Sequence, residues 1–285
     1  MIEIVLDLGM GDAINARSFL IEYCKQLGIS RNSITVYTNR HKVFFENDGF
    51  IIKNIPADNK LKLYRYHNIG DINIVKVYND ELKRDETIAR NAGIDFNFDI
   101  INPFNWNKES IDHINLPERF ITINYGFDNI SDPNKVCAKA WPLEYWNELV
   151  SKINISCVQI GAGKNCKIIN GTKLNLVDKL SIKQSAEVMK KALFHIDIEG
   201  GLVILNHHLG GKTVVLFGPT SLETHALKGN LNIVNNTCKD CPCEPDIKNL
   251  HGIYMKKDDI KCSMQCMKEL KPEYVIEQIY KAGWL

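Results

Sequence analysis

Short apolar stretches alternate along this chain with longer segments in which apolar residues recur at helical spacing. In the first half, the predicted strands are residues 2–6, 33–37, 50–53 and 71–77, and a helix is predicted over 13–27. In the second half, strands are predicted at 120–124, 157–160, 194–198, 214–217 and 232–234, with helices at 142–150, 181–193, 202–209 and 272–282. This alternation favours an α/β fold with parallel sheets covered on both faces.

Two segments do not follow this alternation. Residues 95–118 contain aromatic residues and prolines without clean periodicity, which predicts an irregular connection out of the first half. Residues 60–67 are basic and aromatic, and they fit a solvated edge strand or an exposed strand or loop that binds a ligand.

Composition and charge exclude several classes of protein. The chain has 285 residues, 45% hydrophobic and 24% charged, which is enough for two modest domains or one large one. A formal net charge of +1 gives no basic excess for nucleic acid. No apolar run approaches the ~20 residues of a transmembrane helix, and the N-terminal sequence lacks the basic leader of a signal peptide. The default expectation is a cytoplasmic protein without a transmembrane segment, and peripheral membrane association stays open.

The stretch 194–220 combines a strand, a glycine pair, a short helix and a second strand. Glu199, Gly200 and Gly201 separate the first strand from the helix, and Gly218-Pro219-Thr220 follows the second strand. A helix start of this kind can bind a phosphate through its free amides. The same glycines also suit ordinary tight turns, so the pattern alone leaves both interpretations open.

Asp12 lies where the first predicted strand and loop lead into a helix. Its carboxylate can cap the helix by accepting hydrogen bonds from amides of the first turn. The alternative is a functional carboxylate at the carboxyl edge of the sheet, where open α/β sheets bind ligands.

Five of the nine cysteines lie close together near the C-terminus. They are Cys238, Cys241, Cys243, Cys262 and Cys266. In a reducing compartment, such clustering favours a metal over disulfides. Two short-spaced pairs can bind one tetrahedral zinc or iron ion, with Cys238, Cys241, Cys262 and Cys266 as ligands and Cys243 as the substitute. Free, partly buried thiols are the alternative.

Four motifs in order resemble the glycosyltransferase family 9 enzymes, the ADP-heptose transferases that include lipopolysaccharide heptosyltransferases. Gly11-Asp12 resembles the family's G-D loop, and the run from Lys139 to Trp146 resembles its K-x-W-P-x-x-x-W. The run 199–201 resembles D-[ST]-G, and 216–220 resembles L-F-G-P-T. The cysteine-rich tail, followed by Leu270-Lys271-Pro272-Glu273, adds to the likeness, which is nearly continuous from residue 119.

The resemblance implies a GT-B architecture, in which two Rossmann-like domains enclose the active site in the cleft between them. We expect an acceptor-side domain at 1–118 and a domain at 119–285 that binds the nucleotide-sugar and carries the cysteine-rich segment 238–266. The implied reaction is an inverting, metal-independent transfer of heptose from ADP-heptose, or a similar donor, to a bacterial glycan or protein acceptor, as in lipopolysaccharide biosynthesis.

The resemblance also implies roles for single residues. Asp12 matches the proposed catalytic base, and Lys139 matches the lysine that contacts the donor phosphates. The remaining matched positions are expected to bind the donor; they are Gly11, Glu199, Gly200, Gly201, Gly218, Pro219 and Thr220. Autotransporter heptosyltransferases resemble this chain in the cysteine segment and hold an iron there, which implies a structural rather than a catalytic metal.

The chain departs from the family pattern at several site positions. Glu199 replaces an aspartate, Gly200 replaces a hydroxyl residue, and Ile204 stands at the usual histidine position. His207, one turn further along, fits a surface histidine or one that leans towards the site. Gly163 stands where lipopolysaccharide enzymes tend to have a glutamate. These changes keep two alternatives open: a catalytically weakened relative that binds nucleotides or serves in assembly, and a different α/β ligand-binding protein.

Overall fold

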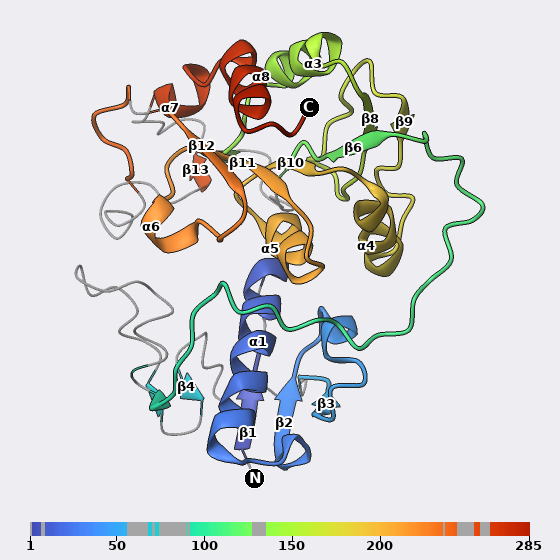
Figure 1. Ribbon diagram of the computed structural model, residues 1–285. Helices are drawn as coiled ribbons and strands as arrows, with labels where there is room; N and C mark the ends of the chain where they lie inside the picture. The colour runs from blue at the N-terminus through green and yellow to red at the C-terminus, as the bar shows by residue number, and fades with distance from the viewer. Residues whose placement is uncertain are drawn as a thin grey trace. The chain divides into compact units, whose positions relative to one another are not determined.

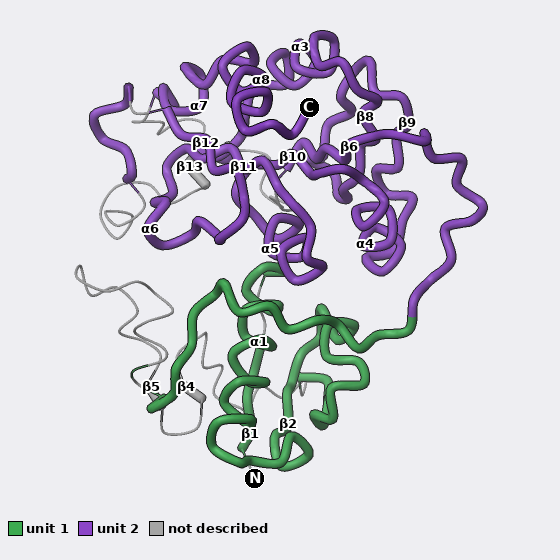
Figure 2. The backbone as a smooth tube through the Cα atoms, in the orientation of Figure 1, with its two compact units in different colours: residues 1–107 green, residues 108–285 purple. Residues whose placement is uncertain are grey.

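The computed structural model describes residues 2–6, 9–55, 68–69, 72–73, 90, 92–126, 135–235, 237–243, 254–256 and 263–285. The chain divides into two compact units, residues 1–107 and 108–285 (Figure 2). The boundary expected after residue 118 falls within the second unit. Among the described residues, no helix is long and apolar enough to cross a membrane.

The first unit is built on a three-stranded parallel sheet in the order β1-β2-β3, with strands Ile2–Val5, Ile34–Tyr37 and Ile51–Lys53. Helix α1 (Met10–Leu27) connects β1 to β2, and it ends at Gly28, whose φ of 65° is left-handed. Short 3-10 turns cover Arg31–Ser33 and Lys42–Phe45, and a small antiparallel pair joins β4 (Asn68–Ile69) to β5 (Ile72–Asn73). The strands and α1 therefore form the predicted strand–helix–strand order.

A buried arginine fastens the irregular segment after residue 95 to the first unit. The Arg17 guanidinium forms a two-pronged ion pair with Asp48, with N–O distances of 2.5 and 2.9 Å. It also donates to the carbonyls of Asn102 and Pro103 at 2.8 Å. Phe104 lies under the same guanidinium, 4.7 Å from ring centroid to Cζ. Because a buried charge is tolerated only when it is paired and hydrogen-bonded, this segment belongs to the core of its unit.

The second unit contains a six-stranded parallel sheet in the order β12-β11-β10-β6-β8-β9. In chain order its strands are Phe120–Ile123 (β6), Ser156–Gln159 (β8), Leu174–Asn175 (β9), His195–Ile198 (β10), Thr213–Phe217 (β11) and Leu231–Val234 (β12). Strands β7 (Lys135–Cys137) and β13 (Tyr254–Lys256) form a separate antiparallel pair. The mixed α/β fold with parallel sheets is confirmed.

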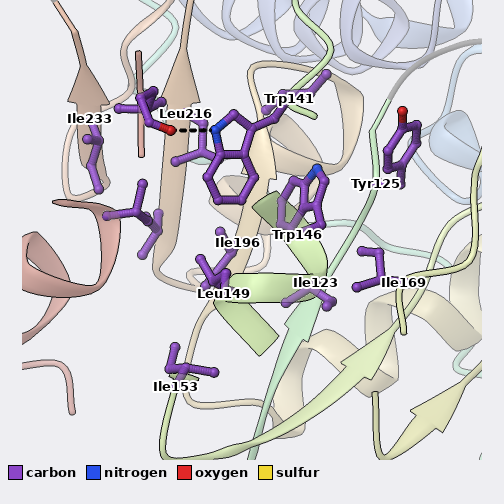
Figure 3. Close-up of a cluster of buried hydrophobic side chains, with 14 of the residues drawn as sticks. Ile123, Tyr125, Trp141, Trp146, Leu149, Ile153, Ile169, Ile196, Leu216 and Ile233 are labelled. Atoms are coloured by element: carbon purple, nitrogen blue, oxygen red, sulfur yellow. Dashed lines mark hydrogen bonds between the residues drawn. The ribbon is translucent and has the colours of Figure 1, made fainter. Parts of the chain in front are cut away.

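Helices cover both faces of this sheet (Figure 1). Helices α3 (Leu143–Lys152) and α8 (Pro272–Lys281) lie on one face, with α7 (Gln265–Lys268) nearby. Helices α4 (Ile182–Lys191) and α5 (Gly201–His208) lie on the other, and the short α6 (Leu222–His225) follows β11. Figure 3 shows the apolar core on the α3 side, in which Trp141 and Trp146 meet edge to face over residues of the sheet.

Most predicted elements are present, with differences at their ends. Helix α1 begins at Met10, three residues before the predicted start at 13. Pro142 caps α3 instead of lying in its first turn, whereas Ser181 caps α4 as predicted and forms a capping box with Gln184. Residues 95–118 are irregular, as expected. The predicted element at 60–67 lies outside the described residues, as does most of 71–77.

Candidate functional site

The sheet of the second unit reverses its strand order between β6 and β10. From β6 the chain continues outward to β8 and β9, then returns to β10 beside β6 and proceeds to β11 and β12. In open α/β sheets, ligands bind outside the carboxyl ends of the strands at such a reversal. The residues that follow β6, β10 and β11 are therefore the candidate site.

Lys139 and Glu199 meet at this edge. The Lys139 ammonium forms an ion pair with the Glu199 carboxylate, and the two side chains are 15% and 11% exposed. Glu199 directly follows β10, and its amide donates to Leu216 O at 3.4 Å. At this low exposure the pair is only partly screened by solvent. The structure thus brings together two predicted donor-site residues from distant parts of the sequence.

Lys139 is placed by the strand before it and by the tryptophan after it. Strand β7 pairs with β13, which places Cys137 opposite Tyr254, and Ala140 N donates to Cys137 O at 3.1 Å in the following turn. Trp141 is fully buried, and its indole N–H donates to Leu270 O at 2.8 Å (Figure 3). A large aromatic side chain with a satisfied N–H is a rigid anchor, so the backbone around Lys139 is held from both sides.

Helix α5 begins at the same edge of the sheet. Gly200 is its N-cap residue and Gly201 its first residue, and Ile204 N donates to Gly200 O at 3.3 Å. The amides of this first turn point out of the helix end, where an anion is favoured.

His207 is only 5% exposed, with its ring centroid 5.6 Å from that of His208, so its interpretation as a surface histidine is wrong. Ile204 is half-buried.

The Gly218-Pro219-Thr220 loop follows β11 and packs against the cysteine segment. A Cβ atom at Gly218 would lie 2.4 Å from Met267 Sδ and 3.5 Å from Cys266 Sγ. Cys243 N donates to Pro219 O at 3.0 Å. Thr220 is buried, and its hydroxyl has no hydrogen-bond partner among the described residues. A side chain at 218 would require Met267 to move, so the loop packs closely against α7.

Four cysteines of the C-terminal segment are described, and their thiols lie near one another without forming a complete metal site; they are Cys238, Cys241, Cys243 and Cys266. Hydrogen bonding to the Cys266 thiol, together with burial, raises the pKa of the Cys241 thiol, and Cys238 and Cys243 are also in hydrogen-bonding reach. Thiols of this kind suit zinc or iron. Among the described residues, however, no group of three or more His, Cys, Asp or Glu side chains is arranged to hold a metal ion. The fourth expected ligand, Cys262, lies outside the described residues.

Asp12 and Gly11 belong to the first unit. Asp12 is the third residue of α1 and half-buried, and the N-cap is Gly9, so the interpretation of Asp12 as the N-cap is wrong. A carboxylate in the first turn of a helix is nevertheless favoured by the helix dipole. Gly11 is buried one residue before it.

Sequence reasoning missed a buried polar cluster beneath the candidate site. His195 and Asp197 of β10 are 1% and 2% exposed, and Asp197 accepts a hydrogen bond from Asn124 at 3.0 Å. Burial raises the pKa of the Asp197 carboxyl. A signal was present in the sequence, because His195 and Asp197 alternate with Ile196 and Ile198, and a buried central strand is usually apolar at every position.

Comparisons with solved structures match this fold to glycosyltransferases. The chain is similar to the iron-containing dodecameric glycosyltransferase TibC from enterotoxigenic E. coli, with a TM-score of 0.69, 13% identity, and coverage of 98% of this chain and 74% of that chain. A glycosyl transferase family 9 structure from Veillonella parvula gives a TM-score of 0.64 at 12% identity, covering 98% and 95%. The ADP-heptose lipopolysaccharide heptosyltransferase II of E. coli gives 0.54 at 15%, covering 98% and 97%.

The sequence matches no protein-family model and no curated protein. The chain therefore has the fold of the family 9 heptosyltransferases, as the sequence motifs predict, and at 12 to 15% identity the likeness shows the fold.

Proposed function

We propose that this protein is an inverting GT-B glycosyltransferase that transfers heptose from ADP-heptose to a bacterial glycan or protein acceptor. One observation carries the proposal: the Lys139–Glu199 ion pair lies where strand order reverses, in a chain with a heptosyltransferase fold. A structure of TibC contains ADP-D-beta-D-heptose, which supports the choice of donor.

In this proposal the second unit binds the donor. The diphosphate lies at the start of α5, where the first-turn amides and the positive helix end favour an anion. Lys139 contacts the diphosphate and stabilises the charge that develops as it leaves. Glu199 holds the ammonium in place before the donor arrives, and it is available to the sugar hydroxyls afterwards. Gly218, Pro219 and Thr220 border the donor on the β11 side, where the buried Thr220 hydroxyl is a spare hydrogen-bonding group.

Asp12 is the proposed catalytic base. Its carboxylate takes the proton from the acceptor hydroxyl as that oxygen attacks the anomeric carbon, and the bond from that carbon to the diphosphate breaks. Attack from the face opposite the leaving group inverts the anomeric configuration. The acceptor accordingly binds to the N-terminal domain, and the reaction occurs in the cleft of a GT-B enzyme. No metal takes part in this chemistry, and the cytoplasm is the proposed location.

The cysteine segment is proposed to hold one structural zinc or iron through Cys238, Cys241, Cys262 and Cys266. Support comes from the mutual proximity of the described thiols and from the iron in the similar enzyme TibC. Bound there, the metal would stabilise the fold around α7. That stabilisation would extend to the loop of residues 218–220. The Cys243 backbone N–H donates to Pro219 O, and Met267 packs on Gly218.

A donor screen tests the proposal. The purified protein is incubated with ADP-heptose and, side by side, with other ADP-, UDP- and GDP-sugars, and both hydrolysis of the donor and thermal shift are recorded. We expect selective stabilisation by ADP-heptose and slow release of ADP. Failure of every nucleotide-sugar to bind would contradict the assignment.

A catalytically weakened relative is the second candidate. Ile204, at the usual histidine position, and Glu199, in place of an aspartate, favour it. Such a protein would bind ADP with ordinary affinity but release none from ADP-heptose, either alone or with an acceptor. The presence of Lys139 and Asp12 favours the active enzyme.

A further inference from the structure

A buried carboxylate joins two strands directly beneath the candidate donor site. Asn124 lies in the segment after β6, and its side-chain Nδ2 donates to Asp197 Oδ2 at 3.0 Å. The backbone N–H of Ile198 donates to Asp197 Oδ1 at 2.8 Å. With 2% of its surface exposed, Asp197 is shielded from solvent. Its hydrogen bonds therefore connect β10 to the chain leaving β6 at the reversal of strand order.

A histidine on the same strand completes the hydrogen bonding of this carboxylate. His195 Nε2 lies 3.4 Å from Asp197 Oδ2, and His195 Nδ1 lies 3.0 Å from the Thr122 hydroxyl. An ionised Asp197 accepts from Nε2–H, and the Thr122 hydroxyl then donates to Nδ1. Asn124 is fixed from its other side, because the Cys166 thiol donates to its Oδ1 at 3.7 Å. The carboxylate thus has defined partners on each side.

The chain leaving β6 passes closely over this carboxylate. Gly126 has a left-handed φ of 66°, and a Cβ atom there would lie 2.4 Å from Asp197 Oδ1 and 2.6 Å from Ile198 Cγ1. Only glycine combines this backbone conformation with this approach. The position of Asp197 consequently determines where the backbone of Gly126 can lie.

The same carboxylate also bears on Glu199. Glu199 directly follows β10, two residues after Asp197. The bond from Ile198 N to Asp197 fixes the Asp197–Ile198 peptide, one residue before Glu199, and Glu199 in turn pairs with Lys139. A shift of Asp197 would therefore be transmitted to both charged residues of the candidate site.

We propose that Asp197 is a positioning residue of the donor site, which holds the Gly126 backbone and the Asp197–Ile198 peptide in place and so orients the Lys139–Glu199 pair. This inference rests on the proposed function. Burying a carboxylate is costly even when it is hydrogen-bonded, and an apolar side chain would suit a central strand better. The free-energy cost of burying this carboxylate arises where the segments that follow β6 and β10 meet, and both segments belong to the candidate site.

The test is the affinity for ADP, measured by titration calorimetry, in the wild type, Asp197→Ala and Asp197→Asn. Alanine leaves the side-chain amide of Asn124 and the backbone N–H of Ile198 without their acceptor. We therefore expect the Kd for ADP to rise at least tenfold. Asparagine keeps the shape but only one acceptor oxygen, so it keeps one of the two links, and we expect Kd to rise clearly less than in Asp197→Ala. If Asp197→Ala does not fold, Asn124→Ala removes the hydrogen bond between Asn124 and Asp197 from the β6 side. This variant should also raise the Kd for ADP.

The matched control is Asn206→Ala. Asn206 is equally buried and donates to Lys212 O at 3.0 Å and Thr213 Oγ1 at 2.9 Å, at the amino end of β11. This variant should lower Tm while leaving Kd unchanged. Wild-type affinity in Asp197→Ala, or an equal loss of affinity in Asn206→Ala, would overturn the positioning role alone. Absence of ADP binding in the wild type would instead contradict the proposed donor and the inference together.

Discussion

Lys139 forms an ion pair with Glu199 across 60 residues of sequence. The two residues come from different parts of the chain, since Lys139 follows β7 and Glu199 directly follows β10. Their side chains are largely shielded from solvent. The ammonium is therefore held at the edge of the sheet, where the proposed donor diphosphate would share it with the carboxylate.

Removal of this ammonium should weaken donor binding. In Lys139→Ala the diphosphate loses a charge-assisted contact, and we expect the affinity for ADP to fall about tenfold or more, which is ~1.4 kcal/mol. Glu199→Gln should have a smaller effect, because the amide still accepts a hydrogen bond from Lys139. Titration calorimetry with ADP measures both changes.

Lys212→Ala is the matched control for this prediction. The Lys212 ammonium lies 5.5 Å from the centroid of the Trp284 ring, so this lysine is engaged elsewhere in the same unit. Its removal should leave the affinity for ADP unchanged. An unaltered affinity in Lys139→Ala would contradict the role assigned to Lys139.

Asp12→Asn should abolish most turnover while donor binding is kept. The amide cannot accept a proton, and loss of a general base typically costs about 10²–10⁴-fold in rate. Transfer is measured as ADP release, and donor binding by calorimetry. Glu22→Gln, which changes a buried acidic residue of the same helix, should leave turnover near the wild-type level. Near-normal turnover in Asp12→Asn would remove Asp12 as the base.

Most of the sheet could be predicted from the sequence because its strands are local apolar runs. Strands β6, β8, β10, β11 and β12 all lie within a residue or two of their predicted ranges. Strands β7 and β13 could not be predicted, because they depend on antiparallel pairing between residues 135–137 and 254–256. Pairing over such a distance leaves no periodic signal in a short window.

The candidate site could be predicted only through its motifs. The resemblance predicts that Lys139 and Glu199 belong to one site, and only the folded chain shows that they pair. The resemblance also predicts that Gly218 binds the donor, but its approach to Met267 follows from the position of α7, which no local pattern indicates. The link from Asp197 to Asn124 likewise depends on which strands become neighbours.

Gly218→Ala should destabilise the fold. The added Cβ would lie 2.4 Å from the sulfur of the buried Met267, and overpacking of this kind typically costs about 1–3 kcal/mol. Urea unfolding measures the loss. Gly200→Ala is the control, because the nearest atom to its new Cβ, Ile198 O, is 3.7 Å away. Equal stability of the two variants would contradict the packing argument.

The cysteine segment should contain about one equivalent of zinc or iron in protein purified without added metal. Elemental analysis measures the content, and Cys241→Ser should lower it sharply because a ligand thiolate is lost. Cys24→Ala, a buried cysteine in α1 of the first unit, should retain the metal. Less than a tenth of an equivalent per chain in the wild type would exclude the site.

The pH dependence of stability should reveal the buried carboxyl of Asp197. Burial raises the pKa of this carboxyl in the folded state above its value in the unfolded chain, about 3.9. The folded protein therefore binds the proton more tightly than the unfolded chain does. The resulting stabilisation is fully present below the unfolded pKa and is lost as pH rises through the folded pKa.

In Asp197→Asn the titrating group is absent, so this loss does not occur. The free energy of unfolding of the variant, minus that of the wild type, should become more positive as pH rises from about 4 through the raised pKa, by about 1.4 kcal/mol per unit of pKa difference. Urea unfolding at a series of pH values gives this difference, in which titrating groups remote from Asp197 cancel. A difference that is independent of pH would mean that Asp197 titrates alike in both states, and one that falls with pH would mean that His195 and Asn124 outweigh burial.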